Sequence, residues 1–220
     1  MHISLNISMT ADGKANFPGA KSLQRIGNDA DMERLKSLRR ESDAILAGSK
    51  TIIFDNAALR VDPKSLRIIN GLIYPLRIAV IGKTLPDPNS NIFRSDLGGS
   101  ALIACGKEIA SVVRDKYSNS LVIECGNEYK VDVEKLVNIL ENDYSVKRLL
   151  VEGGPTVNSL FFENNLADRY YVTVCPYIFG GKGKIITPVG GNPLPDMESG
   201  RYHLIEVIRS DDWLFLTYER

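Results

Sequence analysis

The amino-acid sequence predicts an α/β protein with flanking helices, in which a central, mainly parallel sheet ends in an antiparallel C-terminal part. Through the first two thirds of the chain, short apolar runs alternate with segments that repeat apolar residues at helical spacing. The last third is rich in β-branched and aromatic residues, in segments separated by Gly, Pro and Asp. Alternating strands and helices favour parallel pairing, whereas consecutive strands favour antiparallel pairing.

The individual elements follow from the same periodicities. Residues 2–9 alternate apolar and polar side chains, as a half-buried strand does. A helix is predicted from Asn28 or Asp29 to about Ser42, because Met32, Leu35 and Leu38 recur on one face. Further strands are predicted at 44–47, 77–81, 101–105, 121–125, 148–151, 169–178, 202–210 and 213–218, with helices between 105 and 121, over 133–140 and from 157, and with a loop between 48 and 77.

Composition narrows the class of protein. A chain of 220 residues with 44% hydrophobic and 25% charged residues is typical of a globular enzyme, and we expect a single domain over 1–220. Lys plus Arg equals Asp plus Glu at 27 each, which disfavours nucleic-acid and membrane partners. The three cysteines form no CxxC pair, so we expect neither disulfides nor a metal site. Without a signal segment or a membrane-length apolar run, a cytoplasmic location is predicted.

One junction has the composition of an anion-binding turn. The apolar run 148–151 leads through Glu152 into Gly153, Gly154, Pro155 and Thr156, after which a helix is predicted. Glycines allow a close backbone approach, and the free N–H groups and dipole of a helix start favour phosphate. Two glycines can also simply form a tight turn. The motif is neither a Rossmann fingerprint nor a P-loop.

Three blocks in consistent order carry a family resemblance: LNISMTADGK (5–14), LRRESDAILAGSKTIIFDN (38–56) and LLVEGGPTVNSLFFENNLADRYYVTVCPYIFGGKG (149–183). Together they resemble the reductase domain of riboflavin-biosynthesis deaminase-reductases and their standalone archaeal and fungal relatives. The chain contains no H-x-E or P-C-x-x-C signature, so no deaminase domain is expected.

The resemblance implies a dihydrofolate-reductase-like fold and a homodimer that uses NADPH. It implies reduction of the ribosylamino group of a pyrimidine 5′-phosphate to a ribitylamino group in riboflavin biosynthesis. Hydride would reach C1′ of the sugar, with the chemistry residing in the cofactor and the protein supplying position.

The resemblance also assigns cofactor contacts. It places Thr51, Asp55 and Gly82 at the cofactor, although Asp55 beside Asn56 could form only a turn. Lys50 and Lys83 are candidates for the 2′-phosphate. The pyrophosphate loop that the resemblance implies consists of Gly153, Gly154, Pro155, Thr156 and Val157.

Substrate contacts follow in the same way. Glu152 and Asn6 are implied at the reacting centre, where Glu152 could bind the pyrimidine amino groups or assist proton transfer. Arg39 is implied at the substrate phosphate, although on a helix with several basic residues it could belong to a solvated face. Leu59 and Arg60 are the remaining substrate candidates.

The segment 55–62 departs from the family pattern D-D/N-P-x-L-T-V-R, and the second phosphate arginine is missing from its usual place. Arg60 lies two residues earlier and would share that side if the segment were a strand. This departure leaves two alternatives open: a related NADPH reductase of another pterin-like or heterocyclic substrate, and a non-catalytic nucleotide-binding module.

Overall fold

The computed structural model describes residues 1–16, 26–181 and 187–220. Lys182 and Gly183, at the end of the third family-like block, lie outside the described residues. The chain forms two compact units, which are described separately. Unit 1 comprises Met1–His2 and Leu38–Leu150, and unit 2 comprises Ile3–Ser37 and Val151–Arg220.

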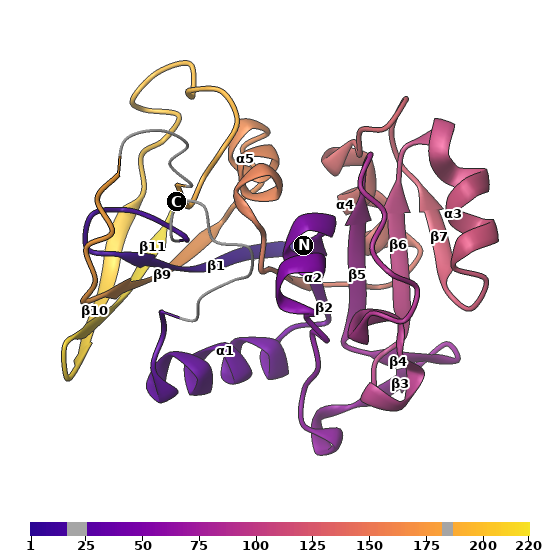
Figure 1. Cartoon of the computed structure of the whole chain (residues 1–220), viewed down its shortest axis with the longest axis horizontal. Helices are drawn as coiled ribbons and strands as arrows, with labels where there is room; N and C mark the ends of the chain where they lie inside the picture. The colour runs from indigo at the N-terminus through magenta and orange to yellow at the C-terminus, as the bar shows by residue number, and fades with distance from the viewer. Residues whose placement is uncertain (17–25, 182–186) are drawn as a thin grey trace. The chain divides into compact units, whose positions relative to one another are not determined.

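Unit 1 is built on a parallel sheet (Figure 1). Its strands are in the order β8-β2-β5-β6-β7, and β2, β5, β6 and β7 pair in parallel. Gly48 is paired with Val80 and Ile81 with Cys105, so the carboxyl ends of these strands lie at one edge. The strand bounds are β2 Ala44–Gly48, β5 Leu76–Ile81, β6 Ala101–Cys105, β7 Leu121–Glu124 and β8 Arg148–Val151.

Helices and a small hairpin complete unit 1. Alternate strand residues such as Ile45 and Ile103 form one core with Ile52 of α2 and Val113 of α3. The other alternate strand residues are buried as well, so the sheet is covered on both faces, as expected for parallel strands. The elements are α2 Ser49–Asp55, α3 Ala110–Lys116, α4 Val133–Asn142, β3 Arg67–Ile69, β4 Leu72–Tyr74 and the 3₁₀ turns Pro63–Ser65, Asn91–Phe93, Ser95–Leu97 and Lys107–Ile109.

Unit 2 contains the antiparallel part of the fold. Its strands are in the order β10-β11-β9-β1, with β1 and β9 parallel and the pairs β9–β11 and β11–β10 antiparallel. The bounds are β1 His2–Thr10, α1 Asp29–Glu41, α5 Pro155–Glu163, β9 Arg169–Cys175, β10 His203–Ser210 and β11 Trp213–Glu219. The predicted combination of parallel pairing and an antiparallel C-terminal part is therefore confirmed.

Helix α1 has the predicted bounds but does not bury the expected apolar stripe. None of its residues, all of which the structure describes, is fully buried. Contact with the sheet is polar and aromatic instead. The Arg34 guanidinium lies 5.1 Å from the ring centroid of Tyr171 and 5.4 Å from that of Phe215, and it donates to Leu216 O. Burial lowers the Arg34 pKa, which the charge of nearby Asp31 partly offsets.

The prediction of a loop between 48 and 77 is wrong. Helix α2 and the β3–β4 hairpin lie there. Helix α2 has only seven residues and no side-chain cap, so its local signal is weak. It is stabilised by packing, because Ile52 is fully buried in the core of unit 1.

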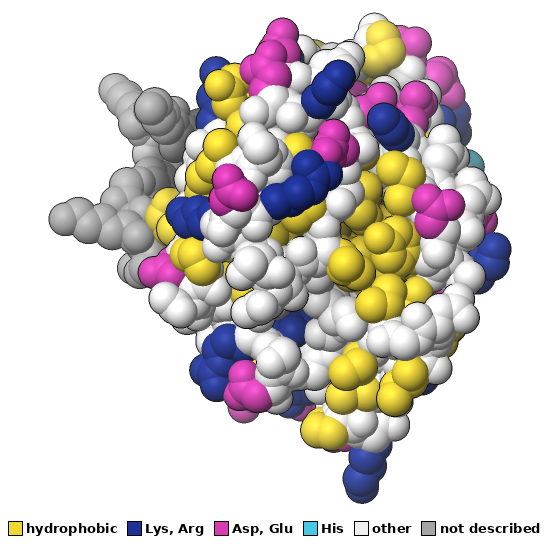
Figure 2. Space-filling model, turned by 90° about the vertical axis from the view of Figure 1, so that its right-hand side faces the viewer, with side chains coloured by type: hydrophobic (Ala, Val, Ile, Leu, Met, Phe, Trp, Pro, Cys, Tyr) yellow, Lys and Arg dark blue, Asp and Glu magenta, His cyan; other side chains and the backbone are white. Residues whose placement is uncertain are grey.

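The surface around α3 has no single-sign patch. Figure 2 shows basic and acidic side chains interspersed on this face, with apolar side chains gathered between them. This distribution agrees with the equal numbers of acidic and basic residues in the sequence.

Candidate functional site

The turn between β8 and α5 has the backbone geometry predicted for an anion-binding loop. Gly153 and Gly154 have φ values of +67° and +49°, and Gly154 is the N-cap of a helix whose first turn holds Pro155. Gly154 O accepts the first helical hydrogen bonds, from Val157 N and Asn158 N. Pro155 has no N–H, so the one first-turn N–H that precedes these donors is that of Thr156; it has no intrahelical acceptor and suits an anionic ligand.

Asn158 explains why the first glycine is required. A Cβ at Gly153 would lie 2.4 Å from Asn158 Oδ1, which is too close for any side chain. Asn158 is fully buried, donates from Nδ2 to Pro188 O at 2.9 Å, and has no partner for Oδ1 among the described residues. Gly190 N also donates to Pro155 O at 2.9 Å. The segment 188–190 is thus fastened to the start of α5.

Glu152 and Asn6 belong to the same unit as this turn. Glu152 directly precedes Gly153, and Asn6 lies in the middle of β1, opposite Tyr171 of β9. Both side chains are half-buried, so both are accessible to a ligand.

Asp12 organises the loop that follows β1. Its carboxylate accepts hydrogen bonds from Lys14 Nζ at 2.7 Å and Gly180 N at 2.8 Å, and also from the Thr10 hydroxyl. The Lys14 ammonium, together with the Thr10 hydroxyl, holds the Asp12 pKa well below its usual value. This carboxylate therefore joins the loop after β1 to the segment after β9.

In unit 1, the cofactor candidates gather at the carboxyl edge of the sheet. Ser49 Oγ donates to Val80 O at 3.0 Å, which links the start of α2 to the end of β5. Thr51 is in the first turn of α2, half-buried, and Gly82 follows β5 directly. Because β2 and β5 are adjacent and parallel, these residues lie at the same edge.

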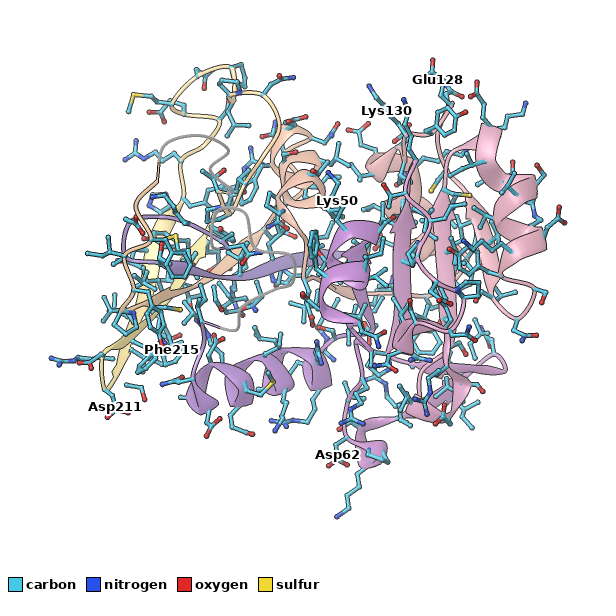
Figure 3. All side chains as sticks on the ribbon, viewed as in Figure 1. Lys50, Asp62, Glu128, Lys130, Asp211 and Phe215 are labelled. Atoms are coloured by element: carbon cyan, nitrogen blue, oxygen red, sulfur yellow. The ribbon has the colours of Figure 1, made fainter. Side chains whose placement is uncertain are left out.

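Sequence reasoning missed the loop 126–131, which joins this edge. A Cβ at Gly82 would lie 3.3 Å from Tyr129 O, and Lys83 Nζ lies 5.3 Å from the centroid of the Tyr129 ring. Figure 3 shows Lys50 and Lys130 at the carboxyl-terminal end of the strands of unit 1, with Glu128 beyond them. A glycine directly after a strand, here Gly126, was the available signal for a loop at this edge.

Asp55 is the last residue of α2 and is exposed. Asn56 follows with a left-handed φ of +44°, and Asn91 N donates to its side-chain Oδ1 at 2.9 Å. The conformation and hydrogen bond of Asn56 support the interpretation that Asp55 and Asn56 form a turn. The contact of Asp55 with the cofactor stays a prediction.

The structure brings two of the substrate candidates together. Arg39 Nη1 donates to the backbone oxygen of Arg60 at 3.2 Å. The Arg60 side chain is exposed, whereas Leu59 is 1% exposed and packs in the core of unit 1. A contact between Leu59 and the substrate stays a prediction. Because the Leu59 side chain is buried, such a contact would be made by the Leu59 backbone.

The strand argument for Arg60 is wrong. Residues 56–62 form no strand, and Leu59 has a φ of +49°. The two-residue alternation of side chains therefore does not apply. The position of Arg60 is set by the burial of Leu59 and by the hydrogen bond from Arg39.

Arg77 anchors this segment from inside unit 1. It is 1% exposed and donates to four backbone oxygens: Ala58 O, Asn91 O, Arg94 O and Gly99 O. Burial lowers the pKa of Arg77 to about 10, and the guanidinium stays charged at neutral pH. A charge inside β5 thus holds the loop that carries Leu59 and Arg60.

The remaining reactive groups are protected. Cys105, Cys125 and Cys175 are free and buried, and burial raises the pKa of Cys125 and of Cys175 to about 12. Among the described residues no cluster of three or more His, Cys, Asp or Glu side chains could hold a metal ion. Within the same part of the chain, every helix is too short or too polar to cross a membrane.

Comparison with known proteins places this geometry in a family. The RibD C-terminal domain matches residues 1–203. The 2,5-diamino-6-ribosylamino-4(3H)-pyrimidinone 5′-phosphate reductase of Methanothermobacter thermautotrophicus is 27% identical over 181 residues, which cover 82% of this chain and 80% of that protein.

Solved structures show the same fold. RibD of Acinetobacter baumannii superimposes with a TM-score of 0.74 at 19% identity, over 99% of this chain and 57% of that one. The riboflavin biosynthesis reductase Rib7 of Saccharomyces cerevisiae gives 0.71 at 18% identity, over 99% and 89%. The chain thus spans little more than half of the RibD protein, and the predicted dihydrofolate-reductase-like fold is confirmed.

Proposed function

This chain belongs to the RibD C-terminal domain family, and on that premise we propose that it is the NADPH-dependent reductase of riboflavin biosynthesis. The reaction is reduction of the ribosylamino group of a pyrimidine 5′-phosphate to a ribitylamino group. The relative from Methanothermobacter thermautotrophicus is named for this reaction. The observation that carries the proposal is the intact turn at Gly153 and Gly154, with its positive φ values at the start of α5.

The residues present fit a dinucleotide. In unit 2, the Thr156 N–H and the dipole at the start of α5 would bind the pyrophosphate, and the absence of a side chain at Gly154 leaves the backbone open to it. In unit 1, Thr51, Asp55 and Gly82 would contact the cofactor at the carboxyl edge of the sheet. When bound, the nicotinamide supplies the hydride.

Lysines at the same edge support NADPH rather than NADH. Lys50 is the second residue of α2, Lys83 follows Gly82, and Lys130 belongs to the loop after β7. Ammonium groups near a sheet edge attract the additional 2′-phosphate of NADPH. The aromatic ring of Tyr129 beneath Lys83 limits where that ammonium can move.

The substrate phosphate would be bound by Arg39 and Arg60. The hydrogen bond from Arg39 to the backbone of Arg60 keeps the two residues in contact, and two guanidinium groups suit a dianion. Arg60 thereby takes the role of the family arginine that is missing two residues later. The altered segment favours, as the second candidate, a related NADPH reductase of another pterin-like or heterocyclic substrate.

Glu152 and Asn6 would act on the pyrimidine and the sugar. Glu152 can accept hydrogen bonds from exocyclic amino groups, or its carboxyl can hold a proton at the reacting nitrogen. Glu152→Gln separates the two, since an amide oxygen still accepts hydrogen bonds but cannot transfer a proton. A loss in kcat with little change in KM assigns proton transfer, and a raised KM assigns binding.

The proposal includes one reductase domain over 1–220 that acts in the cytoplasm as a homodimer, with no nucleic acid or membrane partner. The test is NADPH oxidation with the ribosylaminopyrimidine phosphate in its aminated and its deaminated form. Turnover of either supports the proposal. NADPH binding without turnover of either would favour the second candidate, and absence of both binding and turnover would contradict both. If the chain binds NADPH but reduces no pterin-like or heterocyclic substrate, the remaining interpretation is a non-catalytic nucleotide-binding module.

A further inference from the structure

Residues 188–192 lie along one face of α5, and we call them the strap. At the start of the helix, Gly190 N donates to Pro155 O at 2.9 Å. At the other end, Asn192 N donates to Glu163 Oε1 at 3.3 Å. The helix residues that contact the strap are three or four positions apart, which places them on the same face: Pro155, Asn158, Ser159 and Glu163. The strap therefore follows α5 from its start, beside the glycine turn, to its last residues.

Two glycines allow the strap to lie directly against the helix. A Cβ at Gly190 would lie 3.3 Å from the carbonyl carbon and oxygen of Pro155. Gly191 has a φ of +78°, and a Cβ there would be too close to Glu163 Oε1 and, at 2.6 Å, to Ser159 Oγ. The close packing at both positions fixes the strap on α5.

The Asn158 side chain connects the strap to the glycine turn. Its Nδ2 donates to Pro188 O at 2.9 Å, and this bond fixes which way the carboxamide faces, because Oδ1 in the same place would be repelled by Pro188 O. The carboxamide also packs on Gly153, where a Cβ would lie 2.9 Å from both Cγ and Nδ2 of Asn158 and closer still to Oδ1. One side chain thus contacts both the strap and the turn.

Folding stability alone does not explain an asparagine at position 158. Asn158 is fully buried, and its Oδ1 has no donor among the described residues. A buried acceptor without a donor lowers stability, so an apolar side chain of similar shape, such as leucine, would avoid that cost. Leucine lacks the donor to the strap and the planar group that lies against Gly153. These two features therefore indicate a role other than stability.

The turn needs an external contact because it consists of two glycines. Glycine has access to more backbone conformations than any other residue, so Gly153 and Gly154 do not by themselves keep φ values of +67° and +49°. A ligand binds more weakly when only a fraction of the free protein has the binding conformation. The carboxamide of Asn158 excludes those conformations that would move Gly153 toward α5.

We propose that Asn158 is a positioning residue for the cofactor pyrophosphate, and that it holds Gly153 in its binding conformation from the fixed strap. It acts through Gly153, because its own Oδ1 is an acceptor and would repel a phosphate oxygen. The strap is thereby part of the cofactor site, although it packs on α5 and not on the turn. The inference rests on the NADPH site proposed above.

The test is the NADPH affinity of the whole chain, measured by fluorescence titration. Asn158→Leu should raise the Kd for NADPH about tenfold, because the turn would have its binding conformation only part of the time. With saturating NADPH, kcat and the KM for the pyrimidine phosphate should be unchanged, since the bound turn is the same. A variant that only unfolded more easily would not separate these constants.

Tyr74→Phe is the matched control. It also removes one hydrogen bond from a buried side chain to a backbone oxygen, here Tyr144 O, and it keeps the size of the side chain. Tyr74 lies before the amino end of β5, at the opposite end from the carboxyl edge of unit 1. Its Kd for NADPH should equal that of the unaltered protein. An equal loss of affinity in both variants would reflect general destabilisation and overturn the proposal.

Gly190→Ala tests the strap separately. Its methyl group would press on the Pro155 backbone and move the strap, while Asn158 keeps its carboxamide. NADPH binding should weaken, and adding Gly190→Ala to Asn158→Leu should cause little further loss, because both act through the same contact. Additive losses would overturn the role of the strap.

The outcomes separate this inference from the proposed function. Unchanged affinity in folded Asn158→Leu overturns the inference and leaves the proposed function, whereas an unaltered protein that binds no NADPH overturns both. If circular dichroism shows that Asn158→Leu is unfolded, Gly190→Ala decides by the same titration, and unchanged affinity in that variant overturns the inference.

Discussion

The two segments proposed to bind phosphate groups are built in different ways. The turn at Gly153 and Gly154 depends on backbone conformation and on one neighbour five residues along the chain, Asn158. The segment 56–62 depends on Arg77, a charge buried in β5, and on Arg39 of α1. The turn is stabilised by residues close to it in the sequence, whereas the segment 56–62 is stabilised by residues distant in the sequence. Substitutions should therefore affect the two in different ways.

The largest effect is expected from Arg77→Met. The substitution leaves the four carbonyl oxygens that Arg77 bonds without their donors, and it should lower the free energy of unfolding by about 3–5 kcal/mol. Urea denaturation measures the loss. Arg94→Met is the control, because its side chain is 50% exposed and paired with Asp96, and its loss in the same measurement should be much smaller. Equal losses would show that Arg77 does not anchor the segment.

Gly153→Ala should rank next. A left-handed φ costs a non-glycine residue about 1–2 kcal/mol, and the contact with Asn158 adds to it, so we expect about 2–4 kcal/mol in total. Gly13→Ala separates the two costs, because Gly13 has a φ of +76° but no described neighbour within 4 Å of the added Cβ. Thermal unfolding of both variants tests the comparison. Equal destabilisation of Gly153→Ala and Gly13→Ala would show that the contact with Asn158 adds no cost.

Gly154→Asp tests charge at the same turn. We compare it with Gly154→Asn, since both residues bear the same backbone strain at φ +49° and ψ 164° and differ mainly in charge. The carboxylate should weaken NADPH binding about 10–100-fold relative to the amide, because it occupies the position of an anion. Fluorescence titration gives the two Kd values. Equal affinities would place the pyrophosphate elsewhere.

Arg39→Ala should raise KM for the phosphorylated substrate about tenfold, the effect of losing one charge-assisted hydrogen bond. Arg40→Ala is the control on the same helix, since Arg40 is exposed and adjacent. Steady-state kinetics with phosphorylated and dephosphorylated substrate measure the difference. If both substrates lose equally, Arg39 does not bind the phosphate.

The smallest effect should be the pH dependence of the stability that the Asp12 carboxylate contributes to the loop after β1. Lys14 depresses the pKa of Asp12 in the folded protein, so the stabilisation is fully present above the unfolded pKa of about 3.9. It is lost as the pH falls below that value toward the folded pKa. The difference in Tm between the unaltered protein and Asp12→Asn should therefore be constant near neutrality and shrink below about pH 4. A difference that does not change in acid would contradict the assignment.

The sequence by itself determined the features that depend on short-range patterns. Apolar runs located β2, β5, β6 and β8, because strands buried on both faces are continuously apolar. Gly153 and Gly154 predicted their turn, because few other residues accept those φ values. The three family-like blocks indicated the reductase family, which the match over residues 1–203 shows.

Tertiary structure decided the rest. Helix α2 forms although its seven residues have little helical signal, because Ile52 is buried in the core. Arg77 reads in the sequence as part of an apolar strand, and only the fold surrounds it with carbonyl oxygens. The exposure of β10 is likewise invisible in its apolar sequence, which suits a buried strand equally well. The periodicity of a sequence indicates which side chains will be buried. It does not indicate which groups bury them, because those groups come from distant parts of the chain.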